Sequence, residues 1–166
     1  MPRELLYARR LTDWVLKLEP KASEALQLAA RCQHIRRWEI PRGEFPADKA
    51  GYHRWRTKLK SFHAEIAENI LCNSGYGDAM IARVRELNLK TKFPADPDSR
   101  RLEDALCLVF LEFQLEEFAQ RTDREKVVNA LRKSWAKMTE QGRKAALSLA
   151  LTGKAGELVA EAIRRG

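Results

Sequence analysis

Hydrophobic residues along the chain recur at spacings of three to five positions, the pattern of helices that bury one face. In the first segment, Leu6, Leu11, Trp14, Val15 and Leu18 form such a stripe, with charged residues between them. No stretch alternates apolar and polar residues over more than a few positions, as a half-buried strand would. The pattern predicts an all-α fold of six to eight helices.

Residues with known end preferences mark where the helices begin and end. Pro41 stops a second helix, Asp48 is suited to cap a third, and Gly75 follows that helix as a stop signal. Thr122 and Glu125 have the spacing of a capping box. The predicted helices span, approximately, residues 2–18, 21–38, 49–73, 78–88, 99–120, 123–138, 139–151 and 155–164.

The segment 102–115 is the most hydrophobic of the chain, and its apolar residues occupy every side of a helix. We therefore expect it to be the central, most buried helix. A chain of 166 residues is most simply one domain with a continuous core. Because no run of 18 apolar residues occurs, the sequence predicts no membrane-spanning segment, and we expect no membrane partner.

The cysteines and the N-terminal segment indicate a cellular compartment. Cys32, Cys72 and Cys107 lie within apolar helical patterns and form no CxxC pair. An odd number of such cysteines fits buried thiols in a reducing compartment better than disulfides or a zinc site. The first segment is interrupted by charge at every turn, which argues against a secretory signal. We therefore expect a cytoplasmic protein.

Three ionisable residues stand on faces that are otherwise apolar. His34 follows Leu26 and Ala30 at helical spacing, and His63 shares a face with Leu59, Ile66, Ala67 and Ile70. Asp104 shares a stripe with Leu108, Leu111 and Leu115, and a buried carboxylate needs a partner or a cation.

Two readings of this trio remain open. Two imidazoles and a carboxylate are ligands for a divalent transition metal, so His34, His63 and Asp104 are the candidate metal site. The alternative is a set of hydrogen-bonded pairs that join helices and hold no metal. Glu39 and Glu68 are candidate proton acceptors for a metal-activated water.

Basic residues point to an anionic partner. The net charge is +8, and Lys and Arg far outnumber Asp and Glu between residues 31 and 60, where Trp38, Tyr52 and Trp55 are interleaved with them. Guanidinium groups bind phosphate in a bidentate manner, and tryptophan can stack on a base. The alternative is that these residues only cap helix ends and anchor a loop. The candidate anion-binding residues are Arg36, Arg37, Arg42, Arg54 and Arg56.

Five strings resemble an uncharacterised bacterial and fungal family of small helical proteins, catalogued as a domain of unknown function. The strings are ARCQHIRRWEIPR, AGYHRWR, FHAEIAENIL, LEDALCLVFLE and LRKSWAKM, and they extend from about residue 30 to residue 138. This resemblance covers most of the chain and implies no particular activity.

A second, more distant resemblance is to the HD superfamily of metal-dependent phosphohydrolases. LAARCQHI is similar to the helix with that family's His-Asp pair, FHAEIAENIL to a later histidine helix, and LEDALCLV to the helix of the final aspartate. This implies an HD-like core over about residues 1–121, followed by C-terminal helices over about 122–166. Ile35 stands where the paired aspartate belongs, and no histidine occupies the corresponding part of the first helix. These departures exclude the usual binuclear site.

Two functions follow from this sequence. The first is a divergent HD-like phosphohydrolase that uses one metal ion on a nucleotide-like or phosphorylated substrate. The second is a non-catalytic binding or regulatory module that holds an anionic small molecule or RNA in an arginine-rich pocket. In the metal-free form of this pocket, Arg36 or Arg37 replaces the positive charge of the metal.

Overall fold

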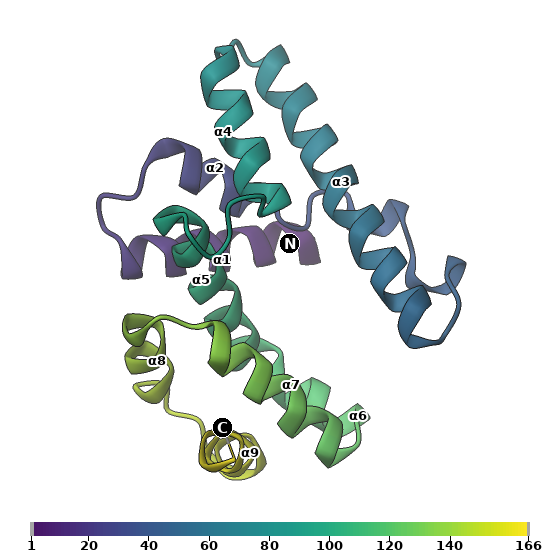
Figure 1. Ribbon diagram of the computed structural model, residues 1–166, viewed down its shortest axis with the longest axis vertical. Helices are drawn as coiled ribbons and strands as arrows, with labels where there is room; N and C mark the ends of the chain where they lie inside the picture. The colour runs from purple at the N-terminus through teal and green to yellow at the C-terminus, as the bar shows by residue number, and fades with distance from the viewer. Residues whose placement is uncertain (1, 166) are drawn as a thin grey trace. The chain divides into compact units, whose positions relative to one another are not determined.

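The computed structural model describes residues 2–165 and confirms the all-α prediction, because this part of the chain contains helices and no strand. Figure 1 shows their course along the chain. The α-helices are α1 (Arg3–Leu18), α2 (Glu24–Cys32), α3 (Lys49–Asn73), α4 (Asp78–Leu89), α5 (Pro97–Phe113), α6 (Leu115–Arg121), α7 (Arg124–Lys137), α8 (Glu140–Leu147) and α9 (Gly153–Arg164). Two short 3-10 helices, η1 (Arg37–Glu39) and η2 (Arg42–Glu44), lie between α2 and α3.

The chain divides into two compact units. The first extends to Ser99 and the second begins at Arg100, so the boundary lies inside α5. A single helical domain with an HD-like core over about residues 1–121 stays a prediction. Within the described residues, no helix is both long and apolar enough to cross a bilayer.

The first unit is built from α1 to α4. α1 contacts α2, while α4 contacts both α2 and α3. Leucine and valine side chains on these helices are almost completely buried, among them Leu11, Val15, Leu26, Val84 and Leu87. α3 begins as predicted, because the Asp48 side chain accepts a hydrogen bond from the backbone N–H of Gly51 at 2.6 Å.

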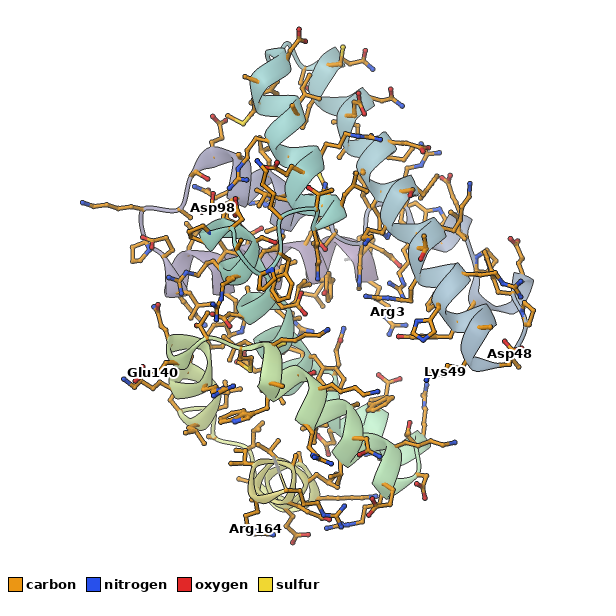
Figure 2. The ribbon with its side chains drawn as sticks, viewed as in Figure 1. Arg3, Asp48, Lys49, Asp98, Glu140 and Arg164 are labelled. Carbon is orange, nitrogen blue, oxygen red and sulfur yellow. The ribbon has the colours of Figure 1, made fainter. Side chains whose placement is uncertain are left out.

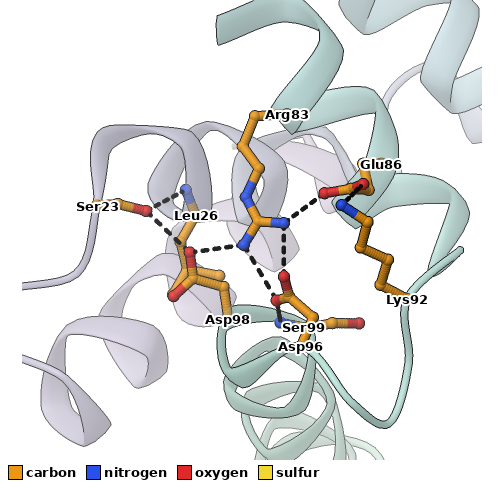
Figure 3. A network of polar contacts seen from close by, with 8 residues as sticks. All are labelled: Ser23, Leu26, Arg83, Glu86, Lys92, Asp96, Asp98 and Ser99. Carbon is orange, nitrogen blue, oxygen red and sulfur yellow. Dashed lines mark hydrogen bonds and ion pairs between the residues drawn. The ribbon is translucent and has the colours of Figure 1, made fainter. Parts of the chain in front are cut away.

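A network of charged side chains joins the segments of this unit (Figure 3). Arg83 of α4 binds Asp96 with both terminal nitrogens, at 2.6 and 3.0 Å, and reaches Asp98 at 3.1 Å. Asp98 also accepts a hydrogen bond from Ser23, the N-cap of α2. Hydrogen bonding to Arg83 lowers the pKa of Asp96. One guanidinium thus links α4 to the start of α5 and, through Asp98, to the N-cap of α2.

The second unit is built from α5 to α9. α7 contacts α9, and α6 contacts both of them. The predicted burial of residues 102–115 is confirmed, since Leu102, Leu108, Val109 and Leu115 are fully buried.

Several predicted helix ends are wrong in detail. The helix predicted over 99–120 is broken at Gln114, where the backbone leaves helical geometry and separates α5 from α6. The N-cap of α7 is Asp123 and not Thr122, because the Asp123 carboxylate accepts from two backbone N–H groups. The prediction of buried thiols holds for Cys32 and Cys107, whereas Cys72 is exposed.

Candidate anion-binding site

The segment after α2 places His34 and Arg37 in a tight turn. The sequence predicted a helix continuing to residue 38, but α2 ends at Cys32. Arg36 then adopts a left-handed backbone conformation, with φ of 51°, which a helix cannot accommodate. The helical spacing that suggested an apolar face for His34 therefore does not apply.

His34 is held between an aromatic ring and a cation. Its imidazole stacks on the ring of Tyr7 in α1, with a centroid distance of 3.7 Å and an interplanar angle of 11°. Its Nε2 lies 3.2 Å from Nη1 of Arg37. Because a guanidinium only donates, Nε2 of His34 is the acceptor in this contact and its proton is on Nδ1.

His63 of α3 presents an unused ring nitrogen. Its Nδ1 lies 2.8 Å from the carbonyl oxygen of Ile35 and donates to it, which leaves the lone pair on Nε2. This Nε2 is buried and has no hydrogen-bond partner among the described residues, and the whole residue is only 5% exposed. The rings of His34 and His63 have centroids 6.3 Å apart. An unsatisfied buried nitrogen of this kind is costly unless a ligand uses it.

Positive charge accumulates around these two rings. Burial lowers the pKa of His34 far below its ordinary value, and the charge of Arg37 lowers it further. Burial also lowers the pKa of His63 to about 4, against the effect of the Ile35 carbonyl and together with Arg37 and Arg56. Both rings are therefore neutral near pH 7.

Arg37 is itself partly removed from water. Burial lowers its pKa, and the charge of Arg56 adds to this effect. Its guanidinium lies over the ring of Trp55, 4.7 Å from the centroid. Within the described residues, neither Arg37 nor Arg56 forms an ion pair with a carboxylate. We call His34, Arg37, Arg56 and His63 the His–Arg site.

Trp55 anchors the turn and does not offer a free face to a ligand. Its indole Nε1 donates to the carbonyl of Ile40 at 2.9 Å, and its side chain is buried with Ile40 and Leu59. Arg42 lies farther from the same ring, at 5.9 Å, and donates to the Phe45 carbonyl. Trp38, by contrast, is 61% exposed.

The other predicted anion-binding arginines are distributed differently. Arg36 is paired with Glu39. Arg54 is exposed on α3, and two residues of helix rotate it away from Arg56. In the described part of the chain, Arg37 and Arg56 are the two of these five arginines whose charge lowers the pKa of His34 and His63.

The predicted proton acceptors are both engaged with arginines. Glu39 is paired with Arg36, and Glu68 of α3 accepts from Arg85 of α4 at 2.7 Å. Their charges are therefore committed to ion pairs on the protein. A catalytic role for them stays a prediction.

Asp104 belongs to the second unit and serves a different purpose there. Its Oδ1 accepts from the backbone N–H of Thr139 at 2.8 Å, and its Oδ2 accepts from the Thr139 hydroxyl. Thr139 in turn caps α8 through the N–H of Gly142. A Cβ on Gly142 would lie 2.4 Å from Oδ1 of Asp104, so this glycine is required by the close approach. Asp104 fixes the start of α8.

The residues present do not fit the divalent metal that the HD resemblance implies. Nε2 of His34 is within hydrogen-bond distance of a guanidinium, and the surrounding charges of Arg37 and Arg56 oppose a second cation. Among residues 2–165, no group of three His, Cys, Asp or Glu side chains is arranged to hold a metal ion. The metal site of His34, His63 and Asp104 stays a prediction that this geometry does not favour.

Two contributors from α1 were missed by the sequence analysis. Tyr7 stacks on His34, and the charge of Arg3 lowers the pKa of both His34 and Arg37 after the larger effects of burial and nearer cations. Arg3 lies at the start of α1 (Figure 2). The two residues are four positions apart and share a helix face, a spacing that was visible in the sequence.

The chain matches one known protein family over most of its length. A family model described as a domain of unknown function, DUF4202, matches residues 1–159. The chain belongs to this family. The DUF4202 match includes every residue of the His–Arg site as well as Asp104. No curated protein and no solved structure matches the chain. The resemblance of this DUF4202 chain to HD phosphohydrolases therefore stays a hypothesis.

Proposed function

We propose that this DUF4202 protein binds a phosphate-bearing anion at the His–Arg site. The observation that carries the proposal is the partly buried guanidinium of Arg37, which has no carboxylate partner among the described residues. Removing a cation from water is costly unless an anion compensates for it. Arg56 adds a second uncompensated charge near the same histidines.

The groups at the site match the chemistry of a phosphate. Guanidinium N–H groups donate to phosphate oxygens in strong, charge-assisted hydrogen bonds. The free lone pair on Nε2 of His63 can accept a hydrogen bond from a protonated phosphate oxygen or a ligand hydroxyl. We therefore favour the binding module over the hydrolase.

Calorimetric titration with inorganic phosphate, at constant ionic strength, tests this proposal. We expect saturable binding to the wild type and at least tenfold weaker binding to Arg37→Gln, since a hydrogen bond to a charged group contributes about 1.5–3 kcal/mol. Arg56→Gln, at an exposed position, should also weaken binding without endangering the fold.

The matched control is Arg54→Gln, which removes the same charge from the same helix. It should change phosphate affinity by no more than about twofold, because Arg54 lies away from the site. Absence of saturable binding to the wild type would overturn the proposal. Equal weakening by Arg37→Gln, Arg56→Gln and Arg54→Gln would also overturn it, since only bulk charge would then be at work.

A further inference from the structure

One face of α3 has a row of basic side chains that leads to the His–Arg site. Lys49, His53, Arg56 and Lys60 follow one another at spacings of four, three and four residues, which keeps them on the same side of the helix. All four are exposed. The next position of this row is His63, three residues after Lys60. Figure 2 labels Lys49 at the start of the helix.

This row, which we call the basic stripe, has no neutralising carboxylate among residues 2–165. The sequence of α3 contains no Asp or Glu from Lys49 to Ala64. Among the residues that the structure describes, Lys49, Arg56 and Lys60 form no ion pair. At 1.5 Å per residue, the distance from Lys49 to His63 along the helix is about 21 Å. A phosphate ion occupies only one end of such a length.

Exposed aromatic rings accompany the positive charge. Tyr52 lies three residues after Lys49 and four before Arg56, so it borders the basic stripe, and it is 46% exposed. Trp38 directly follows Arg37 and is 61% exposed. A path of cations bordered by aromatic rings is typical of surfaces that bind single strands, where the cations hold phosphates and the rings stack on bases.

A membrane surface fits this part of the molecule less well. A helix that lies on a bilayer inserts an apolar face among the lipids. In the first half of α3, the large apolar side chains are Trp55 and Leu59, and both are buried with Ile40 inside the protein. The exposed face that remains in this half of α3 is cationic, with Tyr52 as its large aromatic side chain and no exposed large aliphatic side chain to insert.

We propose that the ligand is a single-stranded nucleic acid whose backbone follows the basic stripe and places one phosphate at the His–Arg site. Bases of the same strand stack on Tyr52 and Trp38. This inference rests on the proposed phosphate site and extends it from one phosphate to several. A stacked strand advances about 3.4 Å per nucleotide, so about six nucleotides span the stripe.

Fluorescence anisotropy with oligouridylates and oligothymidylates of two, four, eight and twelve nucleotides tests the length of the site. Affinity should rise with length up to about six to eight nucleotides and then level off. Comparison of the two series shows whether a ribose hydroxyl adds to binding. If an eight-nucleotide strand binds no more tightly than a dinucleotide, the inference is overturned.

Paired substitutions test the position of the strand. Lys49→Gln with Lys60→Gln should weaken binding of the eight-nucleotide strand at least tenfold and lower the salt slope by about 1.4, at about 0.7 per phosphate contact. Neither residue belongs to the His–Arg site, so phosphate affinity should remain unchanged. Trp38→Ala should weaken strand binding at least about fivefold, as the loss of one stacked base does.

The matched control is Arg54→Gln with Lys58→Gln, which removes the same two charges from the opposite side of α3. It should change strand affinity by less than about threefold. Equal weakening by both pairs would mean that binding follows net charge alone, and this would overturn the inference. Tighter binding to duplex DNA, to an acidic polypeptide or to vesicles containing phosphatidylserine would overturn it as well. If phosphate binds normally while strands do not, only this inference fails; if phosphate itself does not bind, the proposed function fails too.

Discussion

At the scale of single residues, the unusual feature is a neutral histidine among cations. The groups that act on His63 come from three places: His34 and Ile35 in the turn, Arg37 in η1, and Arg56 in α3. No carboxylate is among the causes of its shift. The folded protein therefore disfavours the protonated imidazole, and it does so without any compensating anion of its own.

This predicts a specific dependence of stability on pH. The pKa of His63 is about 4 in the folded protein and near its ordinary 6.5 when unfolded, so between these values the unfolded chain binds more protons. The free energy of unfolding should be fully maintained above pH 6.5 and should fall by about 1–3 kcal/mol as pH decreases to about 4. Urea denaturation at a series of pH values measures this.

His63→Gln should make that part of the profile shallower, because one titrating group is removed, while the lowered pKa of His34 still gives a slope below pH 6.5. His53→Gln is the control, since His53 is exposed on α3. A profile in His63→Gln as steep as that of the wild type would contradict the prediction. Saturating phosphate should also reduce the loss at low pH, because an anion stabilises the protonated imidazole.

At the scale of elements, two arginines of α4 differ in how much their ion pairs should stabilise the fold. Arg83 binds Asp96, Asp98 and Glu86, and the Asp96 side chain is 11% exposed. Arg85 forms one pair with Glu68 in which both side chains are more than 40% exposed. Multiple charge-assisted hydrogen bonds in a shielded setting stabilise a fold, whereas exposed single pairs contribute little.

Arg83→Met should therefore lower the free energy of unfolding by about 2–4 kcal/mol at pH 7, while Arg85→Met should lower it by less than about 1 kcal/mol. Chemical denaturation of both variants measures the contrast. The Arg83 effect should diminish as pH falls below 3.8 and through the lower pKa of folded Asp96, because the unfolded chain binds a proton first and Asp96 then loses the charge that Arg83 stabilises. Similar losses in the two variants would contradict this account.

The sequence predicted the bounds of a helix well where a side chain at its end caps the backbone or where the apolar pattern is regular. Asp48 caps α3 as expected, and the periodic apolar pattern gave α1 and α4 almost to the residue. It failed where the backbone departs from a helix without proline or glycine, as at Arg36 and Gln114. The sequence therefore indicated two histidines and an arginine cluster as candidate site residues, yet it did not predict the turn that positions His34 and Arg37.

The apolar pattern also failed to predict which side of α3 is buried along the length of the helix. Buried residues recur every fourth position, at Gly51, Trp55, Leu59, His63, Ala67 and Leu71. Each step of four residues turns the buried line by about 40°, because a helix has 3.6 residues per turn. The apolar pattern predicted that Ile70 would be buried on the same face as His63, but Ile70 is 47% exposed. The buried line reaches the side of the basic stripe only at His63.

At the scale of the whole molecule, the residues that the sequence grouped into one metal centre divide between two compact units. His34 and His63 lie in the first unit, and Asp104 lies in the second. The Asp104 carboxylate is completely buried and accepts from Thr139. Asp104 therefore stabilises the start of α8, and it is not one of the residues of the proposed phosphate site.

Asp104→Ala should separate these roles. It leaves the N–H and hydroxyl of Thr139 without their acceptor, so the free energy of unfolding should fall by about 2–4 kcal/mol. Phosphate affinity, measured at a temperature where the variant is folded, should change by less than about twofold. If the three residues instead form one metal centre, the substitution should abolish metal-dependent phosphate binding, which calorimetry with and without added Mn²⁺ or Zn²⁺ would reveal.

The unbroken length of α3 fixes the spacing between the basic stripe and His63. This helix runs for 25 residues and carries both the basic stripe and His63 on one rigid rod. Inserting one residue between Lys60 and His63 would rotate the upstream cations by about 100° relative to the imidazole and shift them by 1.5 Å. A lysine there can become an arginine and keep its place, but a gained or lost residue cannot be absorbed by any loop. The proposed strand site therefore depends more on the spacing of these positions than on which basic residue occupies each of them.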